Sequence, residues 1–274
     1  MIVVSPYRSV YENLAFEDLL FDSYGGQSHH LLLYIDEPTV VMGRFQNPWR
    51  EMNLRLMKER GIPPARRVSG GGCVYHDTGN LNFSVFMPRA DFSREGTVGA
   101  VIEVLAGLGI DARTNCRHDI LVDGCKVSGS AYRLVKGKAY HHGTLLVNAD
   151  LDTVGSLLVP SYDGIESSGT PSVASPVTNL SAYSPGVSVG RLIDAFSSCD
   201  AFLDKRSGGG LEIPGSPQVA ARARELASAA WIFGKTPEFI LREGTAAYRF
   251  PKGQLPSDDG FSLPLDDAER LSAD

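Results

Sequence analysis

Tight turns between short apolar runs constrain the fold of this 274-residue chain more than any other feature. Asp123-Gly124 follows the apolar run Ile120–Val122 and is a strong two-residue hairpin signal. A second turn, at Lys136–Lys138, leads into a predicted strand at Ala139–Val147. Hairpins outnumber strand–helix–strand units, so the predicted fold class is α+β, with a mixed, mostly antiparallel β-sheet flanked by helices.

Two further patterns extend the predicted sheet. The apolar runs Leu31–Ile35 and Thr39–Met42 are separated by Asp36-Glu37-Pro38, which indicates another hairpin. Leu81, Phe83 and Val85 alternate with Asn82 and Ser84, which is typical of a half-buried strand.

Helices are predicted from apolar spacing and from residues that start or stop them. Ser9 and Glu12 form a potential capping box for a helix ending near Gly25, and Asn47-Pro48 opens a segment running to Arg60 with Gly61 as its stop. Three other predicted helices are Gly96–Leu108, Ser188–Leu203 and Pro217–Ala230.

Composition narrows the function classes. The net charge is −6, which disfavours bulk nucleic-acid binding, and no apolar run approaches the ~20 residues of a membrane-spanning helix. The four cysteines form no CxxC pair, so no metal site is predicted, and no Arg-rich transit peptide is visible. We expect a catalytic domain over 1–245 and, over 246–274, a flexible tail or a truncated remnant of an accessory C-terminal domain, because the segment from Pro251 has no obvious core face.

The segment Arg66–Asp77 carries the strongest chemical signal. Its three glycines let backbone amides approach an anion, and Arg66 and Arg67 add positive charge. It is neither a Walker A loop nor a dinucleotide fingerprint, because no Gly-Lys-Ser/Thr follows and strand-like sequence comes next. A glycine-rich surface turn remains an alternative for this segment taken alone.

Lys126 lies on a predicted hairpin among small residues, which leaves space for a ligand at its ammonium. A solvated hairpin lysine is the alternative. His141 and His142 are adjacent on a predicted strand and therefore point to opposite faces, which favours a buried, hydrogen-bonded histidine over a metal ligand.

Taken together, these segments resemble the lipoate–protein ligase A and lipoyltransferase family, within the biotin/lipoate protein ligase superfamily. The matching words are Asn47-Pro48-Trp49 with Glu51 and Asn53, Arg66–Asp77 continuing to Gly79-Asn80, Lys126–Ala131, His141–Leu146, Val177–Leu180 and Trp231–Phe239. The resemblance implies a biotin/lipoate protein ligase-like catalytic domain and an enzyme that modifies a lysine of an acceptor protein.

The resemblance also implies roles for particular residues. Lys126 matches the family's catalytic lysine, which would neutralise charge at the acyl carboxylate and α-phosphate. The residues expected to bind the ligand or its adenylate are Arg67, Ser69, Gly70, Gly71, Gly72, Tyr75, Asp77, Asn80, Lys126, Ser128 and His142.

Two departures from the family pattern bear on the reaction. Ala174 replaces an arginine that bacterial ligases carry in the word Ser172–Ser175, and the chain ends soon after Phe239, short of an accessory domain. Both features, with a closer resemblance to mitochondrial lipoyltransferases, favour transfer of a lipoyl group from lipoyl-AMP or a lipoylated donor protein to lipoyl domains of 2-oxoacid dehydrogenases. The expected compartment is the mitochondrial matrix, with bacterial cytoplasm as the alternative.

Other hypotheses stay open at this point. The chain could be a complete ligase that uses lipoate, ATP and Mg²⁺, an acyltransferase with a thioester at Cys73 or Cys125, or a non-catalytic lipoyl-binding module. Glycine cleavage H protein is a further possible donor or acceptor. We expect a monomer, with no nucleic-acid or membrane partner.

Overall fold

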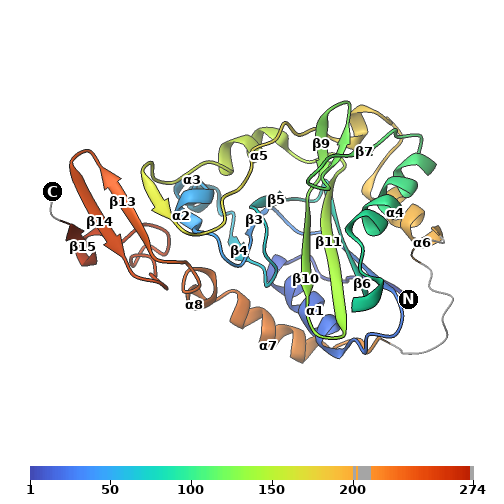
Figure 1. The fold of residues 1–274 in the computed structure, drawn as a ribbon, viewed down its shortest axis with the longest axis horizontal. Helices are drawn as coiled ribbons and strands as arrows, with labels where there is room; N and C mark the ends of the chain where they lie inside the picture. The colour runs from blue at the N-terminus through green and yellow to red at the C-terminus, as the bar shows by residue number, and fades with distance from the viewer. Residues whose placement is uncertain (200–201, 203–210, 272–274) are drawn as a thin grey trace. The chain divides into compact units, whose positions relative to one another are not determined.

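The computed structural model describes residues 1–199, 202 and 211–271 (Figure 1). Its strands are β1 (Ile2–Val4), β2 (His30–Tyr34), β3 (Thr39–Met42), β4 (Pro64–Arg66), β5 (Val74–His76), β6 (Asn80–Pro88), β7 (Arg113–Thr114), β8 (Ile120–Val122), β9 (Cys125–Ser128), β10 (Ser130–Leu134), β11 (Lys138–Leu146), β12 (Ile165–Ser167), β13 (Phe239–Glu243), β14 (Ala246–Phe250) and β15 (Glu269–Leu271). Its α-helices are α1 (Val10–Ser23), α2 (Pro48–Glu51), α3 (Leu54–Arg60), α4 (Arg94–Gly107), α5 (Leu151–Leu157), α6 (Val189–Ser198), α7 (Ser216–Leu226) and α8 (Ala229–Ile232).

The chain divides into two compact units, each built from segments that are distant in sequence. Unit 1 comprises Met1–Glu37, His76–Leu151 and Ala174–Arg222. Unit 2 comprises Pro38–Tyr75, Asp152–Val173 and Ala223–Asp274.

Unit 1 is organised by a five-stranded sheet with the order β1-β2-β6-β11-β10. The β1–β2 pair is parallel, and the other three pairs are antiparallel. The long strands β6 and β11 pair over their whole lengths, from Asn80↔Leu146 to Pro88↔Lys138. The predicted α+β class with mostly antiparallel pairing is confirmed.

The two faces of this sheet differ in chemistry. One face contributes Leu81, Phe83 and Val85 to an apolar core shared with residues of α4 and α6. The predicted strand is confirmed as β6, but its intervening residues Asn82 and Ser84 are also buried, so the prediction that it is half-buried is wrong. Their burial is possible because polar side chains on the second face hydrogen-bond one another.

The predicted hairpin at Asp123-Gly124 is confirmed. Both residues have positive φ, 48° and 79°, and the turn joins β8 to β9 in a small sheet of order β7-β8-β9. The predicted turn at Lys136–Lys138 is confirmed as well: Gly137 has φ 81° there, and the turn joins β10 to the antiparallel strand β11.

Unit 2 contains a three-stranded sheet of order β4-β3-β5 and a four-stranded sheet of order β12-β13-β14-β15. The predicted hairpin of Leu31–Ile35 with Thr39–Met42 is wrong, because β2 and β3 belong to different sheets. β3 pairs in parallel with β4, and Asp36 is a buried hydrogen-bonding residue instead of a turn residue.

Predicted helices are found with shifted ends. Ser9 precedes α1 but makes no side-chain capping bond, so the capping box is wrong. The segment after Asn47 is two short helices, α2 and α3, capped by Asn47 and Asn53, and Gly61 ends α3 with φ 66°. The predicted helix over Ser188–Leu203 is found as α6, but it ends at Ser198 and Cys199 is extended; residues 200–201 and 203 lie outside the described residues.

The expectation that the segment after Pro251 lacks a core face is wrong for 251–271. Leu263 is buried, β15 pairs with β14, and the Trp49 indole N–H donates to the Phe261 carbonyl over 2.7 Å. Sequence reasoning missed this because the last of these contacts joins residues about 200 positions apart. The boundaries 1–245 and 246–274 as catalytic domain and accessory remnant stay a prediction.

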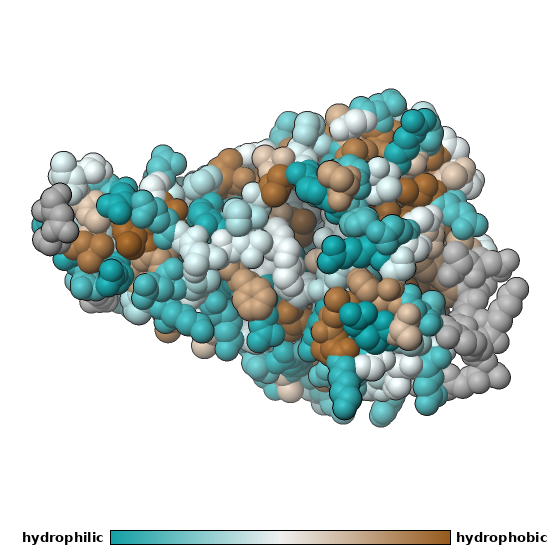
Figure 2. All heavy atoms as spheres, viewed as in Figure 1, coloured by the Kyte–Doolittle hydropathy of each residue, from teal (hydrophilic) through white to brown (hydrophobic). Residues whose placement is uncertain are grey.

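Within the described part of the chain, no helix combines the length and the apolar character that crossing a membrane requires. On the face shown in Figure 2, hydrophobic residues occur in small groups interrupted by hydrophilic ones.

Candidate functional site

Lys126 lies on β9 in unit 1, and its backbone is fixed by a second segment of the same unit. Its N–H donates to the Pro176 carbonyl over 2.8 Å, and its own carbonyl accepts from the Thr178 N–H over 3.0 Å. A parallel bridge to Val177 completes this contact. The segment Val177–Leu180, one of the segments that match the family, therefore holds β9 in place through backbone hydrogen bonds.

Among the described residues, the ammonium of Lys126 pairs with one acid, Asp119. Lys126 Nζ lies 2.7 Å from Asp119 Oδ1, and the two side chains are 23% and 10% exposed. Burial alone would raise the pKa of Asp119, but hydrogen bonds from Lys126, Asn115 and Arg117 hold it below its usual range. Asp119 is thus a carboxylate at neutral pH that positions the lysine, and sequence reasoning missed it because no fixed spacing links the two residues.

Gly129 places no side chain beside the Lys126 ammonium. A Cβ at this position would make ordinary van der Waals contacts, 3.5 Å from Lys126 Nζ and 3.8 Å from Thr144 Oγ1. Ser128 Oγ and Asn80 Oδ1 are buried and have no hydrogen-bond partner among the described residues. Buried polar atoms without partners are uncommon and indicate where a ligand atom could be received.

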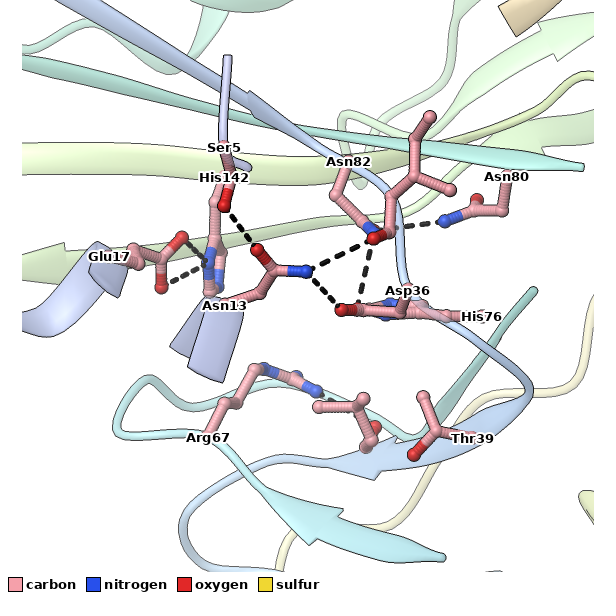
Figure 3. A network of polar contacts seen from close by, with 12 residues as sticks. Ser5, Asn13, Glu17, Asp36, Thr39, Arg67, His76, Asn80, Asn82 and His142 are labelled. Carbon is pink, nitrogen blue, oxygen red and sulfur yellow. Dashed lines mark hydrogen bonds and ion pairs between the residues drawn. The ribbon is translucent and has the colours of Figure 1, made fainter. Parts of the chain in front are cut away.

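His142 is buried on the second face of the unit 1 sheet (Figure 3). Its Nδ1 lies 3.0 Å and 3.2 Å from the two carboxylate oxygens of Glu17 on α1. Ser84 Oγ also donates to Glu17. A histidine held by a buried acid, which itself accepts from a hydroxyl, forms a fixed polar element on this face.

His141 points the opposite way, as expected for adjacent strand residues. It is fully buried, its Nε2 lies 2.9 Å from Ser130 Oγ, and its ring stacks on Tyr132 at 4.7 Å between centroids. Burial lowers the pKa of His141 to about 3, so the ring is neutral at ordinary pH. The prediction of a buried, hydrogen-bonded histidine is confirmed.

A second polar cluster on this face has no counterpart in the sequence predictions (Figure 3). The Asp36 carboxylate lies 2.7 Å from His76 Nδ1, and its other oxygen accepts from Asn13 Nδ2 over 2.7 Å. Asn13 Oδ1 in turn accepts from Ser5 Oγ over 2.6 Å. His76, inside the glycine-rich word, is therefore held by the protein's own residues.

Arg67 holds the glycine loop, Gly70–Gly72, in unit 2. The Arg67 guanidinium donates to the carbonyls of Val41, Gly70 and Gly72 over 2.7–3.2 Å and to Ser69 Oγ over 3.0 Å. Arg67 is only 6% exposed. Because these acceptors belong to the loop and to β3, the bonds fold the loop around the guanidinium.

Arg66 is more deeply buried than Arg67. It is fully buried and donates to the carbonyls of Gly43, Arg44, Gln46 and Ile232 and to Thr236 Oγ1 over 2.6–3.3 Å. Burial lowers the pKa of Arg66 to about 9, so the guanidinium stays charged at neutral pH. The alternative of surface arginines beside a glycine turn is wrong for both Arg66 and Arg67.

Close backbone packing explains a glycine that carried no sequence signal. A Cβ on Gly43 would lie 2.1 Å from the Gly71 carbonyl oxygen, so only glycine allows this contact. Gly71 itself has φ 92° and is exposed. The loop is also tied to Ser172, whose Oγ accepts from the Cys73 N–H over 2.9 Å.

The Cys73 side chain is half-buried beside the glycine loop. Burial raises the pKa of its thiol to about 12, which keeps it protonated at neutral pH. This argues against a thioester intermediate at Cys73.

The Asp77 carboxylate likewise accepts hydrogen bonds from the protein's own backbone. Its two carboxylate oxygens accept from the N–H groups of Gly79 and Asp150, each over 2.8 Å. Tyr75 is 5% exposed on β5. Binding roles for both residues stay a prediction.

The predicted site residues fall in both units. Unit 1 holds Asp77, Asn80, Lys126, Ser128 and His142, and unit 2 holds Arg67, Ser69, Gly70, Gly71, Gly72 and Tyr75.

Comparison with known proteins identifies the chain at the family level. The family model described as "Lipoyl protein ligase A/B catalytic domain" matches residues 9–199, which is most of the chain. The chain belongs to this family. It is therefore a member of an enzyme family, and the resemblance seen in its sequence words is confirmed.

Two relatives show the range of the family. A putative lipoate-protein ligase A of Schizosaccharomyces pombe is 37% identical over 87% of this chain and 72% of the relative. The mitochondrial lipoyl amidotransferase LIPT1 of Homo sapiens is 38% identical over 88% of this chain and 67% of its own length.

Solved structures agree on the fold. A bipartite lipoate protein ligase of Thermoplasma acidophilum, described with its E2 lipoyl domain, has a TM-score of 0.68 at 26% identity, covering 88% of this chain and 97% of that one. A lipoate-protein ligase A bound with ATP has a TM-score of 0.67 at 27% identity, covering 84% and 94%. The predicted lipoate ligase-like catalytic fold is confirmed.

Proposed function

We propose that this family member transfers a lipoyl group from lipoyl-AMP to a specific lysine of lipoyl domains. The single observation that carries the proposal is Lys126, held beside Asp119 with no side chain at the adjacent Gly129. A fixed cation of this kind is what an acyl adenylate needs at its carbonyl and phosphate oxygens. The relatives support the substrate, because their names include a lipoyl amidotransferase and lipoate ligases.

The reaction needs little from the protein beyond charge and position. The acceptor amine attacks the carbonyl carbon of lipoyl-AMP, the new C–N bond forms, and the C–O bond to phosphate breaks. AMP leaves with its electron pair and the amine loses one proton. Lys126 would offset the negative charge that grows on the carbonyl and phosphate oxygens, and Asp119 would act as its positioning residue.

The glycine loop and the polar face have supporting roles in this proposal. The Gly70–Gly72 amides would donate to the adenylate, with Arg67 and Ser69 keeping the loop in shape. Asn80 Oδ1 and Ser128 Oγ, which have no partner among the described residues, would hydrogen-bond the ligand. His142 would line the part of the site that holds the acyl chain.

The activation step is a separate question. A related ligase is described with ATP, and lipoate, ATP and Mg²⁺ would be the substrates and metal if this chain also makes lipoyl-AMP. Ala174 stands where bacterial ligases carry an arginine, which favours transfer without activation. Lipoyl domains are the proposed acceptors, glycine cleavage H protein a further donor or acceptor, and the mitochondrial matrix the proposed compartment, with a monomer as the working form.

Two parallel reactions test the proposal. One contains lipoate, ATP, Mg²⁺ and apo-lipoyl domain, and the other contains synthetic lipoyl-AMP and the same acceptor. We expect the acceptor to gain one lipoyl mass only in the second reaction. Equal modification in the first would establish a complete ligase, and no modification in either would leave a non-catalytic lipoyl-binding module.

A further inference from the structure

Two basic side chains, Arg44 and Lys235, lie over the Trp231 ring in unit 2, and Arg44 links this group to Phe45. The Arg44 guanidinium lies 5.9 Å from the ring centroids of both Phe45 and Trp231. Lys235 Nζ lies 5.6 Å from the Trp231 ring centroid. These distances are within the range of cation–π attraction, so Trp231 holds both cations in place.

The group is rigidly attached to the glycine loop. The Arg44 N–H donates to the Ser69 carbonyl over 2.8 Å, and the Arg44 carbonyl accepts from Arg66 over 2.8 Å. The Trp231 indole N–H donates to the Arg66 carbonyl over 2.7 Å. A surface already fixed by hydrogen bonds within the protein loses little conformational entropy when a partner binds.

The group also combines an exposed aromatic ring with two cations that form no ion pair among the described residues. Phe45 is 56% exposed, the second-largest exposed fraction among the large hydrophobic residues described. Among the described residues, neither Arg44 nor Lys235 has an ion-pair partner, although the whole chain carries a net charge of −6. Aromatic residues and arginine are enriched at protein–protein contact sites, and Phe45 and Arg44 supply both types here.

We propose that Arg44, Phe45 and Lys235 form the docking patch for the acceptor protein, which meets it with an acidic surface that also buries Phe45. The inference rests on the proposed function, because the acceptor is then the lipoyl domain. The patch is continuous with the loop proposed to hold the activated group, so an acceptor delivering its lysine amine contacts this rim. Complementary charge there would raise the association rate.

Steady-state transfer from preformed lipoyl-AMP to a purified apo-lipoyl domain tests the patch. We expect Lys235→Glu and Phe45→Ser to raise the KM for the acceptor roughly tenfold each while kcat and the Kd for lipoyl-AMP stay unchanged. Lys235→Glu should also flatten the salt dependence of kcat/KM. Arg55→Glu is the matched control, since Arg55 is an exposed arginine of the same unit that is paired with Glu59 instead of stacked on Trp231.

Direct binding of the apo-lipoyl domain, measured by fluorescence anisotropy, keeps the test independent of catalysis. Acceptor variants with single carboxylates replaced by lysine should restore tight binding to Lys235→Glu. An unchanged acceptor KM and Kd would overturn the patch, as would a weaker lipoyl-AMP affinity, which would assign these residues to the adenylate. If the wild-type chain transfers nothing yet binds the acceptor through these residues, the proposed function fails and the patch stands.

Discussion

Lys126 in unit 1 and the pair Arg66–Arg67 in unit 2 show two different uses of a buried or half-buried cation. Arg66 and Arg67 are at most 6% exposed, and their guanidinium groups donate to loop carbonyls. Lys126 has a 23% exposed side chain and one acidic partner. Arginine suits the first use because its planar fork serves several acceptors, whereas lysine is a compact charge that can turn to a ligand. The comparison distinguishes two arginines that support the loop from a lysine that is available to a ligand.

Replacing Arg66 should give the largest change in stability. Arg66→Met keeps the volume but leaves the carbonyls of Gly43, Arg44, Gln46 and Ile232 without this donor. We expect the free energy of unfolding of unit 2 to fall by about 4 kcal/mol or more, since each buried unpaired group costs about 1–3 kcal/mol. Urea unfolding followed by tryptophan fluorescence reports on this unit, because both tryptophans, Trp49 and Trp231, belong to it. A loss below about 1 kcal/mol, the lower end of that range, would show that Arg66 is not a scaffold residue.

Gly43→Ala tests the close approach of the two loop segments. Its Cβ would overlap the Gly71 carbonyl oxygen, so the backbone must move. We expect unit 2 to lose about 2–3 kcal/mol, as in other overpacked sites. Gly61 cannot serve as control because its φ is positive, but Gly70, with open space around its Cβ position, can. Equal effects of Gly43→Ala and Gly70→Ala on the unfolding midpoint would contradict the packing argument.

Arg67→Lys keeps the charge and removes the fork. An ammonium carries three donors on one atom, whereas the guanidinium uses three separate nitrogens to reach Ser69 Oγ and the carbonyls of Val41, Gly70 and Gly72. We expect a stability loss of about 2 kcal/mol in the same fluorescence assay, and a weaker lipoyl-AMP affinity as the loop loosens. Full stability with strongly reduced affinity would instead indicate that Arg67 acts mainly on the ligand.

His141 makes unit 1 sensitive to acid in a defined window. Its folded pKa is lowered to about 3, below the unfolded value of about 6.5, so the unfolded state binds the proton first as pH falls. Its stabilising contribution is complete above about pH 6.5 and is lost progressively toward pH 3, with a slope of at most about 1.4 kcal/mol per pH unit. His141→Gln should flatten this slope in unfolding followed by circular dichroism. An unchanged slope would mean that another group controls acid stability.

Much of the fold could be predicted from local sequence, and the site only in part. The turn at Asp123-Gly124 and the strand around Leu145 follow from backbone preferences and periodicity, which are local properties. The pairing of β3 with β4 and the burial of Asn82 depend on contacts between distant segments, which no short pattern records.

The site divides in the same way. The family word around Lys126 predicts the catalytic lysine, whereas Asp119 and Glu17 have no motif of their own and become visible only through their partners. Gly43 is similar, because its need for glycine arises from the position of Gly71. Residue types reveal local chemistry, while partners are fixed by the tertiary fold.

Single-turnover transfer by Lys126→Ala tests the central distinction most directly. With saturating lipoyl-AMP and apo-lipoyl domain, the variant should transfer about 10²–10³-fold more slowly than wild type, the usual effect of removing one charge-stabilising donor. Its unfolding midpoint should remain close to that of wild type, and Lys126→Arg should recover part of the rate. A Lys126→Ala variant that transfers at the wild-type rate, or loses activity only because it unfolds, would contradict the assignment of Lys126 as the working charge.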